Sequence, residues 1–437
     1  MQLLPPDNCK IKTSQRNKAL YFLLLLIFPG SILIDLFTGF TQLQLNLRIS
    51  VAPVYRTALM IWMMWLILRR QNDIFRKTIF FPILFLLIAF PCWLINIGIN
   101  NIQGFQVGIE IESFSKIIYF FIVVCFFVNY RYELLKFNLA KIIGNYGFII
   151  STALILSFIS GYGNLSHGGD YGFGTKSYFK AGNDLGLTII YSLVVYSLDL
   201  VRRFNLVHLL KVIVIACGGS LIGTRVGLVG SLSWIVILII YLGFIYSPSS
   251  ANNKRSLKKF KIFGFPLLAL GIIRFISFII SSFDKYMLIR FSLEGIKNAR
   301  YLLSTYALEY FSSLEGLLIL SGSGMSLLYQ YVGYKMCFPG QYRMVEADLH
   351  ELLGGYGVVG LLILFSPFIY FLVRAIKRIS KSNSFENFSL LFITSSFIFI
   401  AFTAGHCIRN TMVAPIYAYA VSLLFFKNGK HKKNTAC

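Results

Sequence analysis

The chain has 437 residues, of which 57% are hydrophobic and only 13% are charged. Soluble domains contain about 45–50% apolar and about 25% charged residues, so this sequence lacks the polar side chains needed to cover a globule in water. The composition excludes a soluble enzyme, a disulfide-rich secreted domain and a disordered protein. Because a membrane helix needs about 20 apolar residues, the repeated uncharged runs of that length indicate an all-α polytopic membrane protein.

In chain order, the apolar runs predict twelve membrane-spanning helices. They are expected at residues 20–36, 54–68, 78–97, 114–130, 142–160, 183–200, 208–223, 226–246, 262–283, 354–373, 387–404 and 411–426. Clusters of Lys and Arg fall in every second gap, which is the pattern of cytoplasmic loops. The alternation predicts that both termini are cytoplasmic. Residues 1–283 then hold nine spans, residues 284–353 form a large outer loop, and residues 354–437 hold three spans and a basic tail.

The net charge of +24 is explained by these cytoplasmic clusters. No basic stripe remains for DNA or RNA, so we expect no nucleic-acid partner. The seven Cys are scattered, without a CxxC pair or Cys/His metal spacing. Cys9 and Cys437 belong to the tails, and Cys337 is the clearest thiol on the outer side. We therefore expect neither a disulfide framework nor a cofactor.

Basic residues on the outer side are not explained by the orientation rule. They are Lys176, Lys180, Arg225, Arg274, Arg290 and Arg300. An Arg in or beside a membrane is costly, which makes such residues functional candidates. The alternative is that they extend to the interface or pair with a carboxylate such as Asp284 or Glu294. A guanidinium presents paired donors to phosphate oxygens, so these side chains would suit a lipid-linked diphosphate whose tail lies among the spans.

Four ionisable residues lie where the chain leaves the large loop, within EADLHELLGGYGVVG at 346–360. They are Glu346, Asp348, His350 and Glu351. If this stretch is helical, Glu346 and His350 are neighbours on one face, and a carboxylate beside an imidazole suits a general base. The alternative is an ordinary helix start with acidic residues in its first turn. Glu346 and Asp348 could also hold a divalent ion, although two carboxylates are weak evidence for a metal.

Three further motifs complete the pattern. KAGNDLG, at 180–186, places Asn183 and Asp184 at the outer end of the sixth span, where a helix N-cap is the simpler explanation. GTRVGLVG, at 223–230, places Arg225 at the start of the eighth span. Arg300 is followed about twenty residues later by SGSG, at 321–324.

Together these motifs resemble those of the O-antigen polymerase and O-antigen ligase superfamily of bacterial integral-membrane glycosyltransferases. The resemblance covers most of the chain and implies a GT-C-like fold. It implies that a polyprenyl-diphosphate-linked glycan is the donor and that chemistry occurs at the outer face of the bacterial cytoplasmic (inner) membrane. It places the family's motif arginine on Arg225. On this basis Arg225, Arg290 and Arg300 would clamp the donor diphosphate, with Arg274, Asn183 and Lys180 as further substrate contacts.

The stretch at 346–360 departs from the ligase pattern. Ligases of this family show His-Asn, with Gly-x-x-Gly beginning eleven residues after the His; here Gly357 and Gly360 are present, but Glu346 stands at the His position. The acidic form, VEAD, resembles that of polysaccharide polymerases. The resemblance therefore favours a polymerase joining lipid-linked repeat units, with a chain-length regulator as a possible partner, and it leaves the base open among Glu346, Asp348 and His350.

Two alternatives remain open at this point. The first is a ligase that transfers finished glycan to a lipid-A-type acceptor. The second is a flippase for lipid-linked sugars, which would need ionisable residues at mid-membrane. The predicted spans are nearly free of interior charge apart from Arg274, which disfavours the flippase.

Overall fold

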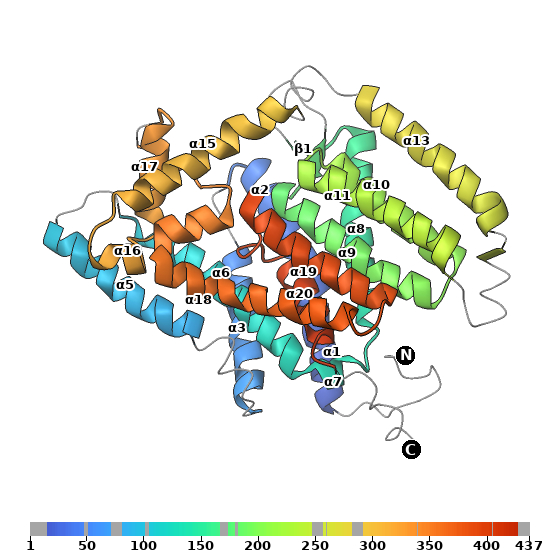
Figure 1. The fold of residues 1–437 in the computed structure, drawn as a ribbon, viewed down its shortest axis with the longest axis horizontal. Coiled ribbons are helices and arrows are strands. Elements are labelled where there is room, and N and C mark those ends of the chain that lie inside the picture. The colour runs from blue at the N-terminus through green and yellow to red at the C-terminus, as the bar shows by residue number, and fades with distance from the viewer. Residues whose placement is uncertain are drawn as a thin grey trace.

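The structure is a computed structural model of the whole chain. It describes residues 15–47, 51–70, 81–100, 105–166, 174–179, 182–246, 257–258, 260–281, 292–338, 340–403 and 405–426. Over these residues the fold is a helical bundle with one small antiparallel pair of strands (Figure 1).

The helices follow one another in two groups along the chain. The first group is α1 (Gln15–Leu25), α2 (Ser31–Leu43), α3 (Ala52–Leu68), α5 (Phe81–Asn100), α6 (Val107–Asn129), α7 (Arg131–Leu134), α8 (Leu139–Ser160), α9 (Gly182–Arg202), α10 (Leu206–Leu221) and α11 (Arg225–Ile240). The second group is α13 (Phe265–Ser281), α15 (Leu293–Ser312), α16 (Leu317–Ser321), α17 (Met325–Lys335), α18 (Asp348–Ile379), α19 (Phe385–Thr403) and α20 (Ala414–Leu423). Short π-helical segments extend three of them: η1 (Leu26–Gly30), η3 (Tyr241–Ile245) and η4 (Phe260–Gly264). Strands β1 (Asn164–Leu165) and β2 (Thr175–Ser177) pair between α8 and α9.

A helix lies at each of the twelve positions where the sequence predicts a span. Among the described residues, seven helical segments are long and apolar enough to cross a membrane: Lys18–Gln42, Val107–Asn129, Leu139–Ser160, Asp184–Arg202, Arg225–Ile245, Asp348–Ile379 and Phe385–Thr403. Helices α3, α10 and α20 are apolar but shorter. The all-α polytopic membrane protein is thus confirmed, while the full number of twelve crossings stays a prediction.

Helix α9 forms the centre of the bundle and is the most deeply buried of the seven candidate spans. It packs most extensively against α8, α10 and α11, and also against α19 and α20. Helix α6 packs between α20 and α3, and α18 packs against α19 and α5. In Figure 1, α5 and α13 lie at opposite edges of the molecule.

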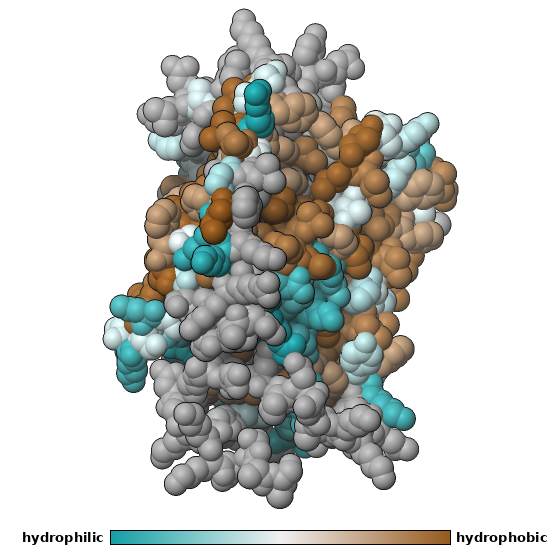
Figure 2. All heavy atoms as spheres, turned by 90° about the vertical axis from the view of Figure 1, so that its right-hand side faces the viewer, coloured by the Kyte–Doolittle hydropathy of each residue, from teal (hydrophilic) through white to brown (hydrophobic). Residues whose placement is uncertain are grey.

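Aromatic rings fill the space among α6, α18, α19 and α20. The rings of Phe397 and Tyr417 lie 4.2 Å apart, and Phe368 stacks on Phe397 at 4.8 Å. Phe120 completes the group at 5.5 Å from Phe397. Each such ring buries a large apolar area and prefers offset or tilted contacts, so these four helices are held at defined separations. On the outside, apolar residues cover much of the described surface in the view of Figure 2, as expected for a surface that faces lipid.

The two ends of the bundle can be told apart by their contacts. Tyr21, in α1, stacks on Phe137 at 5.9 Å, and Phe426, just after α20, meets Tyr132 at 5.4 Å. The first helix therefore starts, and the last helix ends, at the same end of the bundle, beside α7. This agrees with termini on one side of the membrane, while the cytoplasmic identity of that side stays a prediction.

Two glycine-rich motifs pack against each other at the opposite end, SGSG at 321–324 and GGYG at 354–357. The Gly324 N–H donates to the Gly355 carbonyl at 2.9 Å. Gly357 has φ 68°, in the left-handed region that favours glycine, and interrupts the regular helix of α18. A Cβ on Gly322 would lie 2.1 Å from the Gly355 carbonyl oxygen. This close backbone contact joins the large loop to the start of α18.

Candidate functional site

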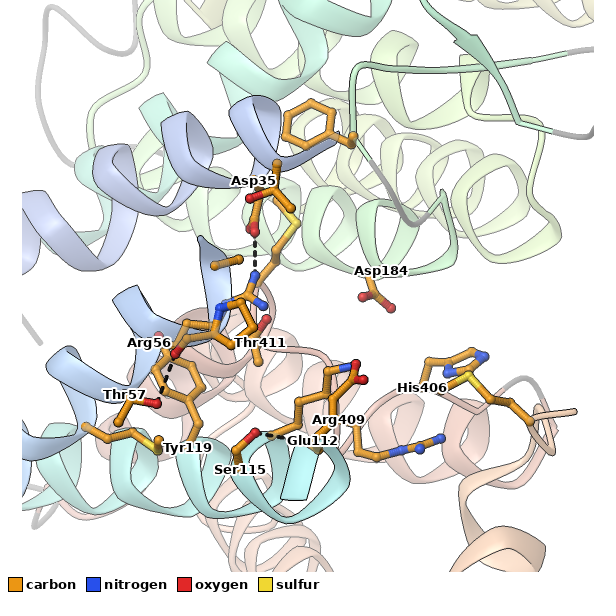
Figure 3. A pocket seen from close by; sticks show the side chains of 18 of the residues that line it. Asp35, Arg56, Thr57, Glu112, Ser115, Tyr119, Asp184, His406, Arg409 and Thr411 are labelled. Carbon is orange, nitrogen blue, oxygen red and sulfur yellow. Dashed lines mark hydrogen bonds and ion pairs between the residues drawn. The ribbon is translucent and has the colours of Figure 1, made fainter. Parts of the chain in front are cut away.

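A cavity of about 530 Å³ lies at the end of the bundle next to the large loop (Figure 3). Its wall comes from α2, α3, α6, the first turn of α9 and the loop at 405–413, with Met344 added by the large loop. The acidic and basic side chains that line it are Asp35, Arg56, Glu112, Lys116, Asp184, His406 and Arg409. Its volume falls in the range of about 300–1,000 Å³ that is usual for ligand sites.

Two of the cavity's cations are paired with carboxylates from neighbouring positions. Arg56, near the start of α3, donates to Asp35 of α2 at 2.5 Å. Lys116 pairs with Glu112 one turn earlier in α6 at 2.7 Å. Such pairs neutralise charge in the cavity wall and fix the direction of each cation, while a guanidinium and an ammonium each keep further N–H donors.

The third cation, Arg409, is held by a buried network. Its guanidinium donates to Glu351 in the first turn of α18 and to the Tyr329 hydroxyl of α17. Arg409 is 7% exposed and Glu351 1%. Burial by itself lowers the pKa of Arg409, but Glu351, Tyr329 and Asp348 together outweigh it and raise the pKa above its usual value. Arg409 therefore keeps its positive charge at the cavity wall.

The loop that carries His406 and Arg409 is anchored by Asp348. One carboxylate oxygen of Asp348 accepts the His406 N–H at 2.7 Å, and the other accepts the N–H groups of Cys407 at 2.6 Å and Ile408 at 3.2 Å. A buried carboxylate that accepts several backbone N–H bonds holds the chain in place. Asp348 thus fixes the loop that supplies one wall of the cavity.

Asn410 ties the same loop to α9. Its side-chain amide donates to the Asp184 carbonyl at 3.0 Å, and its oxygen accepts the N–H groups of Met412 and Val413. The Asp184 side chain itself lines the cavity, and Figure 3 shows it between the Arg56–Asp35 pair and His406. No hydrogen bond or ion pair joins its carboxylate to another residue in the described part of the chain.

The first turns of α9 and α11 touch, which brings Arg225 to this end of the bundle. Thr224 caps α11 by accepting the Gly227 N–H at 3.2 Å. A Cβ on Gly186 would lie 3.1 Å from the Gly227 nitrogen, so the two backbones lie close together at this contact. Arg225 follows the cap and is half-buried.

The other residues predicted to bind substrate are placed less closely. Arg274 is exposed on α13. Lys180 and Arg290 lie outside the described residues, and Asn183 and Arg300 are described only by their positions in α9 and α15. Lys176 of β2 is partly buried, which lowers the pKa of its ammonium.

The three candidates for the base do not line the cavity. Helix α18 begins at Asp348, so Glu346 precedes it and the expected helical pairing of Glu346 with His350 does not form. His350 is half-buried, and its Nδ1 has no hydrogen-bond partner among the described residues. None of Glu346, Asp348 and His350 is among the residues lining the cavity. They also belong to no described cluster of three or more possible metal ligands.

Four basic residues of the cavity were not predicted from the sequence: Arg56, Lys116, His406 and Arg409. Arg56 and Lys116 lie inside predicted spans, near what the topology makes their outer ends, and Arg409 lies in the short gap before the last span. The argument that outer-side cations are unexplained by orientation applies equally to these three. Arg225 and Arg274 were selected at or inside spans by the same argument, and extending it to every span end identifies these three residues as well.

Comparison with known families adds one finding. The sequence profile described as O-antigen ligase like membrane protein matches residues 16–301, which is more than half of the chain. The match includes Arg56, Lys116, Asp184 and Arg225 and ends before the loop at 405–413. Comparison with curated proteins finds no similar sequence. The family comprises ligase- and polymerase-like membrane glycosyltransferases, which points to surface polysaccharide biosynthesis and lipid-linked glycan substrates. By its matched residues and its multi-pass helical fold, this chain belongs to the O-antigen ligase-like membrane protein family.

Proposed function

We propose that this protein is a surface-polysaccharide polymerase. It joins polyprenyl-diphosphate-linked oligosaccharide repeat units at the outer face of the cytoplasmic membrane. The observation that carries this proposal is the cavity beside the large loop, where Arg56, Lys116 and Arg409 converge from α3, α6 and the loop at 405–413. A lipid-linked diphosphate carries its charge at the membrane surface, and this cavity lies at an end of the helical bundle.

The cavity's cations act on the leaving group. When the bond from the sugar to the diphosphate breaks, negative charge develops on the phosphate oxygens. Fixed cations aimed at that charge stabilise the transition state without reorganisation. Arg409 is suited to this because its buried partners hold it in one place and keep it charged. No nucleotide is needed, since the diphosphate already activates the sugar.

Arg225 adds a second contact with the donor in this proposal. It lies at the start of α11, whose first turn touches the first turn of α9 at the cavity wall. Arg290 and Arg300 of the large loop complete the diphosphate clamp that the family resemblance implies. Arg274, exposed on α13, is a further substrate contact in this proposal, away from the reacting atoms.

The polymerase is favoured over the ligase by the acidic VEAD stretch, which has Glu346 where ligases of the family carry a His. The ligase remains the second candidate because the matched family profile is described by ligase likeness. The two enzymes share a donor and differ in the acceptor, which is a second lipid-linked repeat unit for the polymerase and a lipid-A-type glycolipid for the ligase.

The test compares surface polysaccharide, separated on a gel, from the source strain and from a strain lacking this gene. The deletion strain should carry glycan limited to one repeat unit, and the wild-type gene should restore the ladder of longer chains. Arg409→Ala and Arg225→Ala should fail to restore it at matched membrane levels. Lys335→Ala, which removes an exposed cation from α17 outside the cavity, should restore it fully.

Other outcomes point to the alternatives. A deletion strain that forms long chains on the lipid carrier but attaches none of them to the cell surface lipid identifies a ligase. A strain with no surface glycan, and with single repeat units held at the inner face, identifies a flippase. Either result overturns the polymerase proposal.

A further inference from the structure

We infer that Asp184 is the general base that removes the proton from the acceptor sugar's hydroxyl in this cavity. The inference rests on the proposed function, because it assigns a chemical step to the glycosyl transfer. It moves the base from the stretch at 346–351, where the sequence led us to expect it, to the first turn of α9.

The carboxylates around the cavity differ in what they already bind. Asp35 accepts from Arg56 at 2.5 Å, Glu112 pairs with Lys116 at 2.7 Å, and Glu351 is bound by Arg409 and Tyr329. Asp348 accepts three backbone N–H groups. Asp184 is the carboxylate at the cavity to which no described residue donates a hydrogen bond. Both of its oxygens are therefore available to an incoming hydroxyl, as a general base requires.

The main chain of Asp184 is nevertheless held firmly. The Thr188 hydroxyl donates to its carbonyl at 2.6 Å, and Asn410 donates to the same atom at 3.0 Å. The residue begins the most buried of the candidate spans. A base must lie within hydrogen-bond reach of the proton that it removes, and these two contacts hold Asp184 in position beside the loop that carries Arg409.

The residues around Asp184 suit both the acceptor hydroxyl and the leaving diphosphate. The cations Arg56, Lys116 and Arg409 line the same cavity. The cations can therefore contact the donor's diphosphate while Asp184 contacts the acceptor's hydroxyl. Figure 3 shows Asp184 across the cavity from Arg56. The positive end of the α9 dipole also favours a carboxylate in its first turn.

The proposed transfer is a single displacement at the anomeric carbon of the donor. The acceptor hydroxyl gives its proton to a carboxylate oxygen of Asp184, and its oxygen forms a bond to the anomeric carbon of the donor. The bond from that carbon to the diphosphate oxygen breaks, and its electron pair leaves with the polyprenyl diphosphate. Asp184 then releases the proton to water. Because the other cavity carboxylates are paired with cations, none is assigned as a nucleophile, and the configuration at the anomeric carbon is inverted.

The experiment uses the full-length protein in membranes of the deletion strain, with single-repeat lipid-linked units extracted from that strain as donor and acceptor. Initial rates of chain formation are measured for wild type, Asp184→Asn, Asp184→Glu and Asp184→Ala at several substrate concentrations. Asp184→Asn should lower kcat by about 10²–10⁴-fold, the usual contribution of a general base. Its KM should stay within about threefold of wild type, since the lost interaction acts in the transition state.

Two further readouts separate a base from a structural residue. Formate, a small carboxylate, should raise the rate of Asp184→Ala by at least about tenfold by taking the place of the missing base. Asp184→Glu keeps the carboxylate and should retain measurable activity. Glu315→Gln, which changes an exposed carboxylate outside the cavity, serves as the matched control and should behave as wild type.

Different results separate a wrong assignment of the base from a wrong assignment of the function. If Asp184→Asn forms chains at the wild-type rate, this inference is overturned and the polymerase proposal stands. The same conclusion follows if Asp184→Glu is inactive and Asp184→Ala is inactive both with and without formate. If Glu346→Gln or His350→Ala instead lowers kcat alone, the base lies in that stretch. If wild-type protein forms no chains from the lipid-linked units, the proposed function itself fails, and the inference fails with it.

Discussion

At the scale of single residues, the buried pair of Arg409 and Glu351 controls the most rigid cation of the cavity. Removing one partner of a buried ion pair leaves the other charge uncompensated and costs about 3–5 kcal/mol. Glu351→Gln should therefore lower the free energy of unfolding by about 3 kcal/mol, seen as a lower melting temperature of the full chain in detergent. Glu309→Gln breaks the exposed pair of Glu309 with Lys335, whose side chains are 43% and 38% exposed, and should leave the melting temperature nearly unchanged because water screens such a pair. Equal losses from the two variants would contradict the assigned role of the buried pair.

Asp348 gives a second prediction at this scale, because it was expected as a base and the structure gives it the bonds of an anchor. Asp348→Ala removes the acceptor of three N–H groups in the loop at 405–413, and each buried donor left unpaired costs about 1–3 kcal/mol. The loop should loosen, and trypsin should then cut after Arg409. Limited proteolysis of the purified full-length protein measures this, with Glu315→Ala as control. Unchanged cleavage together with lost activity would restore Asp348 as a candidate base.

The sequence predicted which chemical groups occur at the site better than which particular residues supply them. Guanidinium groups at one end of the bundle follow from charge and topology; Arg225 lies at the start of α11, and its part in the site stays a prediction. The roles of Arg409 and Asp184 depend on what surrounds them. Arg409 is fixed by Glu351, 58 positions earlier in the chain, and Asp184 is distinguished from Asp35 and Glu112 only by its lack of a described partner. Such differences arise from tertiary contacts that a single sequence does not display.

At the scale of elements, the contact between SGSG at 321–324 and GGYG at 354–357 leaves very little space for side chains. A Cβ on Gly357 would lie 2.5 Å from the Leu320 carbonyl oxygen, at a backbone φ of 68°. Left-handed backbone on a residue other than glycine costs about 1–3 kcal/mol, and the clash adds to it. Gly357→Ala should therefore lower the melting temperature clearly. Gly271→Ala, at a helical position with no atom within 4 Å of the added Cβ, should be neutral or stabilising by about 0.5–1 kcal/mol.

The same contact explains which element boundaries the sequence could give. Long apolar runs located a helix at all twelve expected positions, because a run of that length has few other structures open to it in a membrane. The start of α18 was set at residue 354 from the apolar pattern, whereas the helix begins at Asp348. Its first turn is polar because Asp348 and Glu351 bind a distant loop and Arg409. The break at Gly357 likewise depends on its contact with residues 320–322.

At the scale of the whole molecule, the site is assembled where separate helices end together. Helices α2, α3, α6 and α9 and the loop at 405–413 meet at the cavity, although their contributing residues extend from Asp35 to Met412. Alternation of helix direction brings these ends to one side, and topology alone predicts that much. Which helix ends lie next to one another on that side depends on the central position of α9, and the sequence of α9 does not reveal that position.

The side of the membrane on which the cavity lies decides whether the proposed chemistry is possible, and cysteine labelling tests it. Cys337 is exposed in the large loop, just after α17, while Cys437 belongs to the basic tail that the positive-inside rule assigns to the cytoplasm. Variants that keep only one of these two cysteines should react differently with a membrane-impermeant maleimide. Cys337 should be labelled in intact spheroplasts, and Cys437 only after lysis. The reverse pattern would place the cavity on the cytoplasmic side, where the proposed polymerisation at the outer face could not take place.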